Sequence, residues 1–535
     1  MQRLMKNLYK YIYVAAAAVL GLNACNKFLD TMPDNRAELD SEEKIAAMVG
    51  SAYSRHNYTL VTNLMSDDCD NNENVVTSAP SQFFFEVWNW EDVTQSNNSS
   101  PESVWSDLWS CIACANQALE AIDEMGGPNA SASLAASYGE ALMCRAYCHF
   151  VLVNLFCLNY NSATSATDLG IPYMDTPEKG LNPSYERGNV AEVYEKIEDD
   201  IEEGIKYVGD DYTAPKYHFT RQAANAFAAK FYLFYEKWDK AVEYATECLG
   251  TEPATMLRDY TDLQNNFVTI ATARRAYNSS DYKCNLLINT GYSNVGYFFG
   301  NYSGSYKYFG PTTLIETTEG LLSRRPWAKE GMASTNLKFR THTYTSSALS
   351  YTLLWKVDYE FEYTNPVAGT GYAHTVYVPL KTDETLLIRA EAYTLLKEYD
   401  LAMADINLWC NNFYATSINM TADEVTDFYA NEVAYYTWDE PTTKKHLNPA
   451  FEIDAEGSTQ ESLLQLILNC RRTENWGEGL RWFDIKRYGI KIYRRAVNGN
   501  AQLSEITDSL EVNDLRRAIQ VPLRCIDAGL EANPR

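Results

Sequence analysis

Residues 229–241 read AKFYLFYEKWDKA, and residues 390–402, 161 positions further along the chain, read AEAYTLLKEYDLA. The two stretches share small and aromatic residues at matching positions: Ala229, Tyr232, Trp238, Asp239 and Ala241 correspond to Ala390, Tyr393, Tyr399, Asp400 and Ala402. Alanines where two helices cross, with an aromatic and an acidic residue at the turn, are typical of tetratricopeptide repeats. Because such helical pairs bury their apolar faces by stacking, the pattern predicts a mainly α fold built on helical repeats.

Helical periodicity extends outward from these pairs. Apolar residues from Val190 to Val208 recur at i, i+3, i+4 and i+7 spacing behind a candidate N-cap, Asn189, with Glu192 three residues later. The same kind of spacing predicts helices over 42–56, 101–125, 132–158, 220–236, 238–249, 383–397 and 399–413.

The character of the chain changes between residues 250 and 382, where helical spacing gives way to Gly, Ser, Asn, Thr and Tyr. Segment 292–309 holds eight aromatic residues among glycines and serines. Long polar-aromatic insertions in ordered proteins are commonly functional. We therefore expect 250–382 to carry ligand-binding loops in a second, irregular α/loop-rich half, between helical regions at 25–249 and 383–535.

The N-terminus has the features of an export signal. Arg3, Lys6 and Lys10 precede an apolar run over 11–22 that is too short to span a membrane as a mature helix. Leu22-Asn23-Ala24-Cys25 follows and resembles the lipobox of bacterial lipoproteins. This predicts a signal peptide at 1–24 and lipidation of Cys25; the alternative is an ordinary signal peptide that ends near a cysteine.

Charge and cysteine content exclude some functions. Removing residues 1–24 takes three positive charges from a net charge of −26 and leaves −29. So acidic a protein is a poor candidate for binding nucleic acid or an anionic membrane surface.

Eleven cysteines remain besides Cys25. Cys111 and Cys114, and Cys144 and Cys148, have helical spacing that would suit a metal, but nothing completes a four-ligand set. We predict structural thiols, no metal and no cofactor.

The sequence offers little catalytic chemistry. We find no phosphate-binding loop, HExxH, GxSxG or dinucleotide motif. With 71 acidic residues, a glycosidase pair of carboxylates remains an open alternative. The acidic run 67–73 could hold calcium but lacks the spacing of an EF-hand, so we favour a solvated or hydrogen-bonding loop.

Several stretches, in order along the chain, resemble the SusD/RagB family of outer-membrane lipoproteins. The first is Cys25 to Asp34, CNKFLDTMPD. The others are Trp105 to Glu120, Gly139 to Tyr147, Gly170 to Pro172, Arg187 with the helix from Val190, Leu387 to Ala392 with Asn407, Arg471 to Glu474, Glu478 to Arg487 and Val521 to Leu523. The resemblance implies a tetratricopeptide-like half beside an irregular half that carries the binding insertions. It also implies that Arg389 and Glu391, and likewise Arg481 and Asp484, are partners in internal ion pairs.

The family's function, carried over as an expectation, is not enzymatic. A surface-exposed lipoprotein of the outer membrane captures oligosaccharide and delivers it to a SusC-like TonB-dependent transporter. Two alternatives stay open: a peptide receptor of the RagB type, and a tetratricopeptide scaffold that bridges proteins.

Aromatic loops are the candidate ligand contacts. Sugars present apolar C–H faces ringed by hydroxyls, so flat rings beside polar side chains suit them. A first aromatic cluster, which includes Phe83, Phe84 and Phe85, is expected in the loop region after the first helix. The predicted ligand-binding residues are Trp88, Trp90, Tyr297, Tyr302, Trp327, Asp67 and Asn89. Two or three rings predict weak binding, on the order of millimolar to micromolar.

Overall fold

The structure is a computed structural model that describes residues 39–76, 79–178, 184–300, 308–328, 336–345, 350–498 and 502–535. Residues 45–535 group into one compact unit, to which all contacts below belong. The predicted signal peptide, Cys25 and Tyr302 lie outside the described residues. Within the described ranges, no helix is both long and apolar enough to span a membrane.

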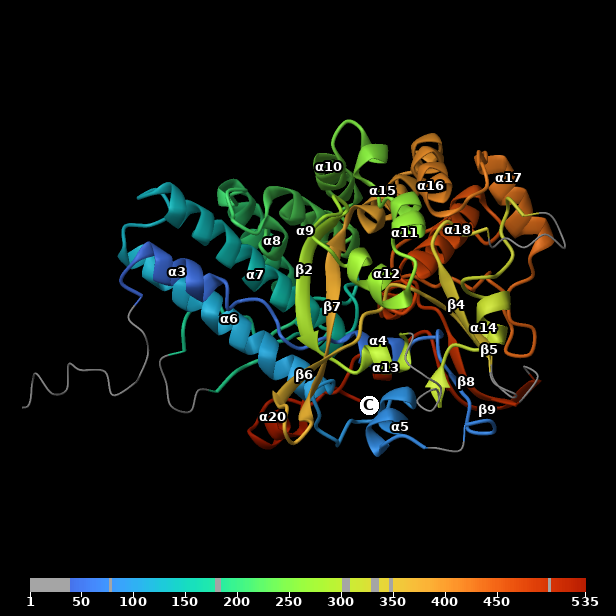
Figure 1. The fold of residues 1–535 in the computed structure, drawn as a ribbon, viewed down its shortest axis with the longest axis horizontal. Helices are drawn as coiled ribbons and strands as arrows, with labels where there is room; N and C mark the ends of the chain where they lie inside the picture. Colours follow the sequence, from blue (N-terminus) through green and yellow to red (C-terminus); the bar gives the residue numbers. More distant parts are fainter. Residues whose placement is uncertain are drawn as a thin grey trace, which may run out of the picture. The chain divides into compact units, whose positions relative to one another are not determined.

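The main helices confirm the periodicity analysis (Figure 1). They are α6 (Pro101–Glu124), α7 (Ala132–Phe156), α8 (Val190–Tyr207), α9 (Arg221–Phe234), α10 (Trp238–Leu249), α15 (Thr382–Leu395) and α16 (Tyr399–Phe413). Helix α8 begins at the predicted cap: Asn189 accepts from the Glu192 backbone N–H, and the Glu192 side chain accepts from the Asn189 backbone N–H. This reciprocal capping satisfies two backbone donors that the first turn leaves free.

The internal repeat is visible in the backbone. Helices α9 and α10 form one antiparallel hairpin and α15 and α16 form another, with α10 packed against α15. Both turns contain a non-glycine residue in the left-handed region, Glu236 (φ 60°) and Lys397 (φ 64°), again 161 positions apart. The hydrogen bonds repeat as well: Lys237 N donates to Tyr232 O, and Glu398 N donates to Tyr393 O.

The predicted first helix, 42–56, is wrong in its C-terminal half. Helix α3 spans Glu42–Val49, and a separate helix α4 spans Thr59–Met65. Between them the Asp107 carboxylate on α6 accepts from the backbone N–H groups of Arg55 (2.6 Å) and His56 (3.0 Å). Two tertiary hydrogen bonds thus replace helical backbone hydrogen bonds in this segment.

Residues 250–382 are not simply loops, because they contain much of the strand structure. An antiparallel sheet has the order β2-β7-β6, formed by Asn285–Tyr292, Thr370–Lys381 and Glu360–Asn365. Strands β4 (Thr341–Thr345) and β5 (Ser350–Leu354) form a hairpin. The short helices here are α11 (Tyr260–Asn266), α12 (Ile270–Tyr277), α13 (Val295–Phe298) and α14 (Thr313–Thr318).

A second sheet joins distant parts of the chain. Its order is β3-β1-β8-β9, formed by Phe309–Gly310, Asp70–Asn71, Ile492–Asn498 and Gln502–Leu510. The remaining helices are α5 (Gln82–Trp88), α17 (Ala422–Asp427), α18 (Thr459–Glu474), α19 (Arg481–Arg487) and α20 (Leu523–Asp527). Helix α18 packs against α15 and is buried from Gln460 to its end.

Candidate ligand-binding site

Two of the predicted ligand-binding residues, Trp88 and Trp90, lie in the core. The first aromatic cluster belongs to helix α5 and its C-terminal end rather than to a loop, and Trp88 and Trp90 are only 4% and 2% exposed. Their indole N–H groups donate to the backbone carbonyls of Cys69 (3.4 Å) and Met65 (2.9 Å). The Arg494 guanidinium lies 4.7 Å and 3.9 Å from the two rings. Trp88 and Trp90 therefore hold a buried cation and are closed to a ligand in this structure.

Asp67 is likewise a buried ion-pair residue. Its carboxylate accepts two hydrogen bonds from Arg481, at 2.8 Å and 2.9 Å, and lies near Arg472 and Lys445. Burial alone would raise the pKa of Asp67, but the charges of Arg472 and Arg481 hold that pKa well below its usual value. At Asp67 the acidic run is therefore hydrogen-bonded, which agrees with one of the two predicted alternatives, and Asp67 is not available to a ligand.

The other predicted residues have mixed positions. Tyr297 is partly exposed on α13, its ring 4.3 Å from that of Tyr359 and hydrogen-bonded to it through the hydroxyl groups. Trp327 is half-buried against Tyr414, with ring centroids 4.9 Å apart. Asn89 is half-buried at the C-terminal end of α5. Of the predicted rings that the structure describes, Tyr297 and Trp327 thus keep some exposed surface.

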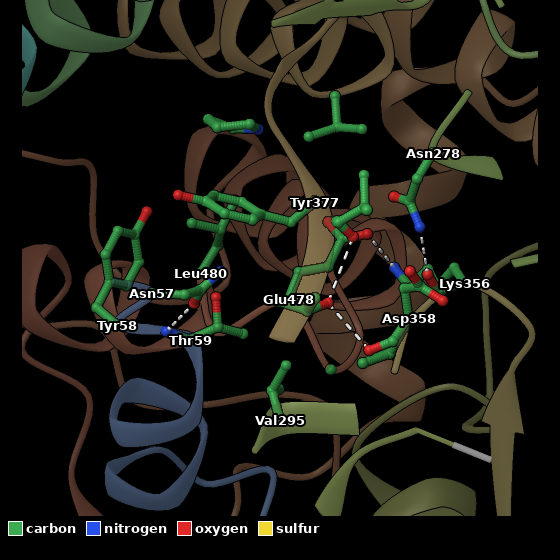
Figure 2. A pocket seen from close by; sticks show the side chains of 16 residues that line it. Asn57, Tyr58, Thr59, Asn278, Val295, Lys356, Asp358, Tyr377, Glu478 and Leu480 are labelled. Carbon is green, nitrogen blue, oxygen red and sulfur yellow. Dashed lines mark hydrogen bonds and ion pairs between the residues drawn. The ribbon is translucent and has the colours of Figure 1, made fainter. Parts of the chain in front are cut away.

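Residues far apart in the sequence form a small concave pocket that is partly open to solvent and has about 40 Å³ of internal space (Figure 2). It is lined by Asn57, Tyr58, Thr59, Asn278, Val295, Lys356, Val357, Asp358, residues 375–379, Gly477, Glu478 and Leu480. Figure 2 shows Asn57 to Thr59 on one side, Lys356 and Asp358 on the other, and Glu478 between them in this view. This space holds a few water molecules and lies below the range typical of small-ligand sites, so it admits at most a small polar group of a ligand.

Charged groups in and beneath the pocket pair with one another. Glu478 accepts from Lys381 at 2.6 Å and is 3.1 Å from Lys356. Burial alone would raise the pKa of Glu478, but the two lysine charges hold that pKa at about 2. Asp358 pairs with Arg274 at 2.9 Å. Glu478 is thus ionised at neutral pH and has no proton to give to a leaving group, as glycosidase catalysis would require.

Two tyrosine rings form part of the pocket wall. Tyr58 and Tyr377 both line the pocket and are partly exposed. The Tyr377 hydroxyl accepts from Asn289 Nδ2 at 3.2 Å, and the Tyr58 ring packs edge-on against Phe483 at 5.7 Å. These contacts fix both rings in orientation before a ligand arrives.

Sequence reasoning missed this pocket. None of its residues was singled out as a ligand contact, although Glu478 opens one of the family-like stretches. The residues come from separate segments, such as 57–59, β7 and the loop before α19, and only the tertiary fold brings them together. The local signal that could have found it is the polar Glu478-Gly479-Leu480 loop, in which Gly479 has a positive φ of 77°.

The predicted internal ion pairs exist, but with other partners. Arg389 pairs with Asp405 at 2.8 Å, and Glu391 pairs with Arg487 at 2.7 Å. Arg481 pairs with Asp67 as described, while Asp484 lies 3.0 Å from Arg471. Residues close together in a helix therefore face different neighbours.

The described cysteines are free thiols, all buried apart from the half-buried Cys114 and Cys525. Across the same described ranges, no cluster of three or more His, Cys, Asp or Glu side chains could hold a metal ion.

A family model described as "Starch-binding associating with outer membrane", SusD-like, matches residues 27–233. Solved structures of the SusD superfamily match nearly the whole chain. The fold of the chain is SusD-like. A SusD superfamily protein from Bacteroides thetaiotaomicron is 17% identical, with a TM-score of 0.59 over 92% of this chain and 98% of that one. No curated protein matches the chain.

The names of two further solved structures mention a ligand. A putative sugar binding protein from Bacteroides vulgatus is 16% identical, with a TM-score of 0.62 over 93% of this chain and 99% of that one. A laminarin binding SusD-like protein is 16% identical, with a TM-score of 0.53 over 92% and 98%. At these identities the likeness establishes a shared fold.

Proposed function

We propose that this SusD-like protein is a lipid-anchored outer-membrane protein that binds oligosaccharide and delivers it to a SusC-like TonB-dependent transporter. The single observation that carries the proposal is the SusD-like fold over some nine-tenths of the chain. The family description, starch-binding and associated with the outer membrane, and the laminarin-binding relative support a glycan as the ligand.

The described site supports binding rather than catalysis. The pocket offers aromatic walls and polar groups, and its carboxylates lie in ion pairs. Two rings would bury on the order of 300 Å² or more, and part of that gain is lost in immobilising the ligand. Binding on the order of millimolar to micromolar suits a protein that must release its ligand to a transporter.

The glycan part is tested by screening the detergent-solubilised full-length protein against an array of neutral, acidic and amino oligosaccharides, with a peptide library beside it. We expect binding to oligosaccharides. Binding to peptides alone would favour the alternative function, a peptide receptor of the RagB type.

The delivery part is tested by extracting native membranes in mild detergent and identifying the co-purifying proteins by mass spectrometry. We expect a TonB-dependent barrel, held close to this protein because a shared membrane raises their effective concentration. Recovery of this protein with soluble partners only would favour the alternative function, a tetratricopeptide scaffold that bridges proteins. A Cys25→Ser variant should leave the membrane fraction; if it stays as firmly as the wild type, Cys25 is not the anchor.

A further inference from the structure

Two buried thiols from different helices are in direct contact. Cys410 lies on α16 and Cys470 lies on α18, and the two residues are 0% and 1% exposed. The two helices touch, and the two thiols are hydrogen-bonded to each other inside an apolar core that also contains Trp409 and Ile467. Facing helices with their sulfur atoms in contact are the arrangement from which a disulfide can form.

A second pair of thiols is less well defined. Cys111 on α6 and Cys148 on α7 are also hydrogen-bonded to each other. Cys144, one turn before Cys148 on α7, lies close to both of them. Cys111 therefore has two candidate partners, whereas the contact between α16 and α18 joins one thiol to one other.

Export, which the N-terminal features predict, would bring the chain to a compartment where disulfides form. Secreted and cell-surface proteins fold where thiols are oxidised, whereas cytosolic proteins are kept reduced. A buried cysteine by itself is explained as a small apolar residue. Packing alone, however, gives no reason for thiols from two separate helices to meet.

We propose that a disulfide joins Cys410 and Cys470 in the exported protein. The proposal rests on the export part of the proposed function. The reaction is exchange with an oxidant that carries a disulfide. One cysteine thiolate attacks that disulfide and forms a mixed disulfide, and the second cysteine then attacks to form the bond between Cys410 Sγ and Cys470 Sγ. The oxidant gains two electrons and leaves as two thiols, which take up the two protons that the cysteines lose.

The exchange takes place before α16 and α18 have packed together. Burial raises the pKa of the Cys410 thiol well above its usual value, although the charge of Arg325 acts in the opposite direction. Only the thiolate attacks a disulfide, and the folded core shields both sulfur atoms. The bond therefore forms while the exported chain folds, and the finished core then protects it from reduction.

The disulfide ties together the two ends of a long and largely irregular segment. Cys410 and Cys470 are 60 positions apart, and the chain between the end of α16 and the start of α18 contains the short helix α17 and a single π-helical turn, Phe428–Glu432. Lys445 in this segment lies 2.6 Å from the buried Glu319. Closing a loop of this length restricts the unfolded chain, so the disulfide should raise the melting temperature.

The test uses the full-length protein extracted from membranes, denatured in N-ethylmaleimide to alkylate free thiols, and digested without reductant. By mass spectrometry we expect a peptide pair linked through Cys410 and Cys470. Cys248 and Cys284 are the internal controls and should be alkylated, because they are equally buried and contact Thr385 and Asn285 instead. Alkylation of both Cys410 and Cys470 in most molecules would overturn the proposal.

Cys470→Ala is the matched variant. It should leave Cys410 alkylated and lower the melting temperature, whereas Cys248→Ala should keep the linked peptide pair. If Cys470→Ala fails to fold, the peptides of the wild type still decide. A reductant should then lower the melting temperature of the wild type as well, and no change with reductant would count against the disulfide.

These outcomes are distinct from failure of the proposed function. A disulfide-linked protein that binds no glycan or recruits no barrel would keep the disulfide and remove capture or delivery. A protein that binds glycan with both thiols alkylated would keep capture and remove the disulfide.

Discussion

Arg494 fixes four backbone carbonyls of a segment more than 400 residues away in sequence. Its guanidinium donates to the carbonyls of Leu64 (2.8 Å), Met65 (3.0 Å), Ser66 (2.9 Å) and Trp88 (2.6 Å). Burial lowers the pKa of Arg494 to about 9. The planar, five-donor guanidinium can serve this many acceptors, whereas an ammonium group has only three donors.

Arg494→Lys should therefore lower the free energy of unfolding by about 2–4 kcal/mol, because at least one buried carbonyl loses its donor. Urea denaturation measures the loss. The control is Arg516→Lys, whose 29% exposed side chain pairs with Asp508 and Asp514; its cost should stay below about 1 kcal/mol. If Arg494→Lys is as stable as the wild type, the additional N–H donors of the guanidinium are not needed for stability.

Glu478 makes stability depend on acidic pH. Its folded-state pKa of about 2 lies below the ordinary value of 4.5. Its contribution is thus fully present above pH 4.5 and is lost as pH falls from 4.5 to 2. The shift corresponds to at most about 3 kcal/mol. We expect Glu478→Gln to be less stable than wild type at pH 6 by that order, with the difference vanishing near pH 2 in denaturant titrations at each pH. A difference that stays constant with pH would contradict this assignment.

At the scale of elements, the two helical hairpins depend on left-handed turn residues. A non-glycine residue in this region costs roughly 1–2 kcal/mol, and a β-branched residue is tolerated least. Glu236→Val and Lys397→Val should each lower stability by about 1–2 kcal/mol. Glu236→Gly and Lys397→Gly should be neutral or stabilising by up to about 1 kcal/mol. Thermal unfolding of the four variants tests this; valine tolerated as well as glycine would mean that the turns can relax.

At the scale of the whole molecule, a buried charge cluster connects segments from the beginning, middle and end of the chain. Its members are Asp67, Asp68, Asp70, Glu319, Lys445, Arg472, Arg481 and Arg495. Arg472 lies at its centre, 2.7 Å from Asp68 and 3.6 Å from Glu319. Removing one partner of such a cluster leaves the opposite charges buried without compensation.

Arg472→Met should lower stability by about 3–5 kcal/mol and increase hydrogen exchange in α4, α14 and α18 together. Hydrogen exchange measured by mass spectrometry tests this expectation. If the substitution destabilised α18 alone, exchange would increase in α18 and not in α4 or α14. Lys397→Ala provides the matched surface control. Its pair with Asp454, at 2.8 Å, is well exposed and should be worth less than about 1 kcal/mol.

The helical hairpins and the cap of α8 were predictable because their signals are local. Apolar spacing and an N-cap residue act within a few residues of where they stand. Strands β2, β6 and β7 were missed because their pairing joins residues up to 96 positions apart, as Asn285 and Lys381 are, and the tyrosine-rich composition also suits a loop. Helix α18 was missed because polar and charged residues occupy all its sides, so its sequence shows no separate apolar face. The partners of these polar and charged side chains lie in other segments of the chain.

The sequence alone was enough to predict the helical hairpins, to reveal the family resemblance and to suggest an export signal, since each of these depends on residues close together in the chain. The tertiary structure alone decided which aromatic and charged residues are accessible. Trp88, Trp90 and Asp67 looked like ligand contacts, yet Arg494 and Arg481 approach them from the far end of the chain. Burial and ion pairing depend on contacts between distant segments, so Asn57 and Glu478 become a candidate site only when folding brings both to one pocket.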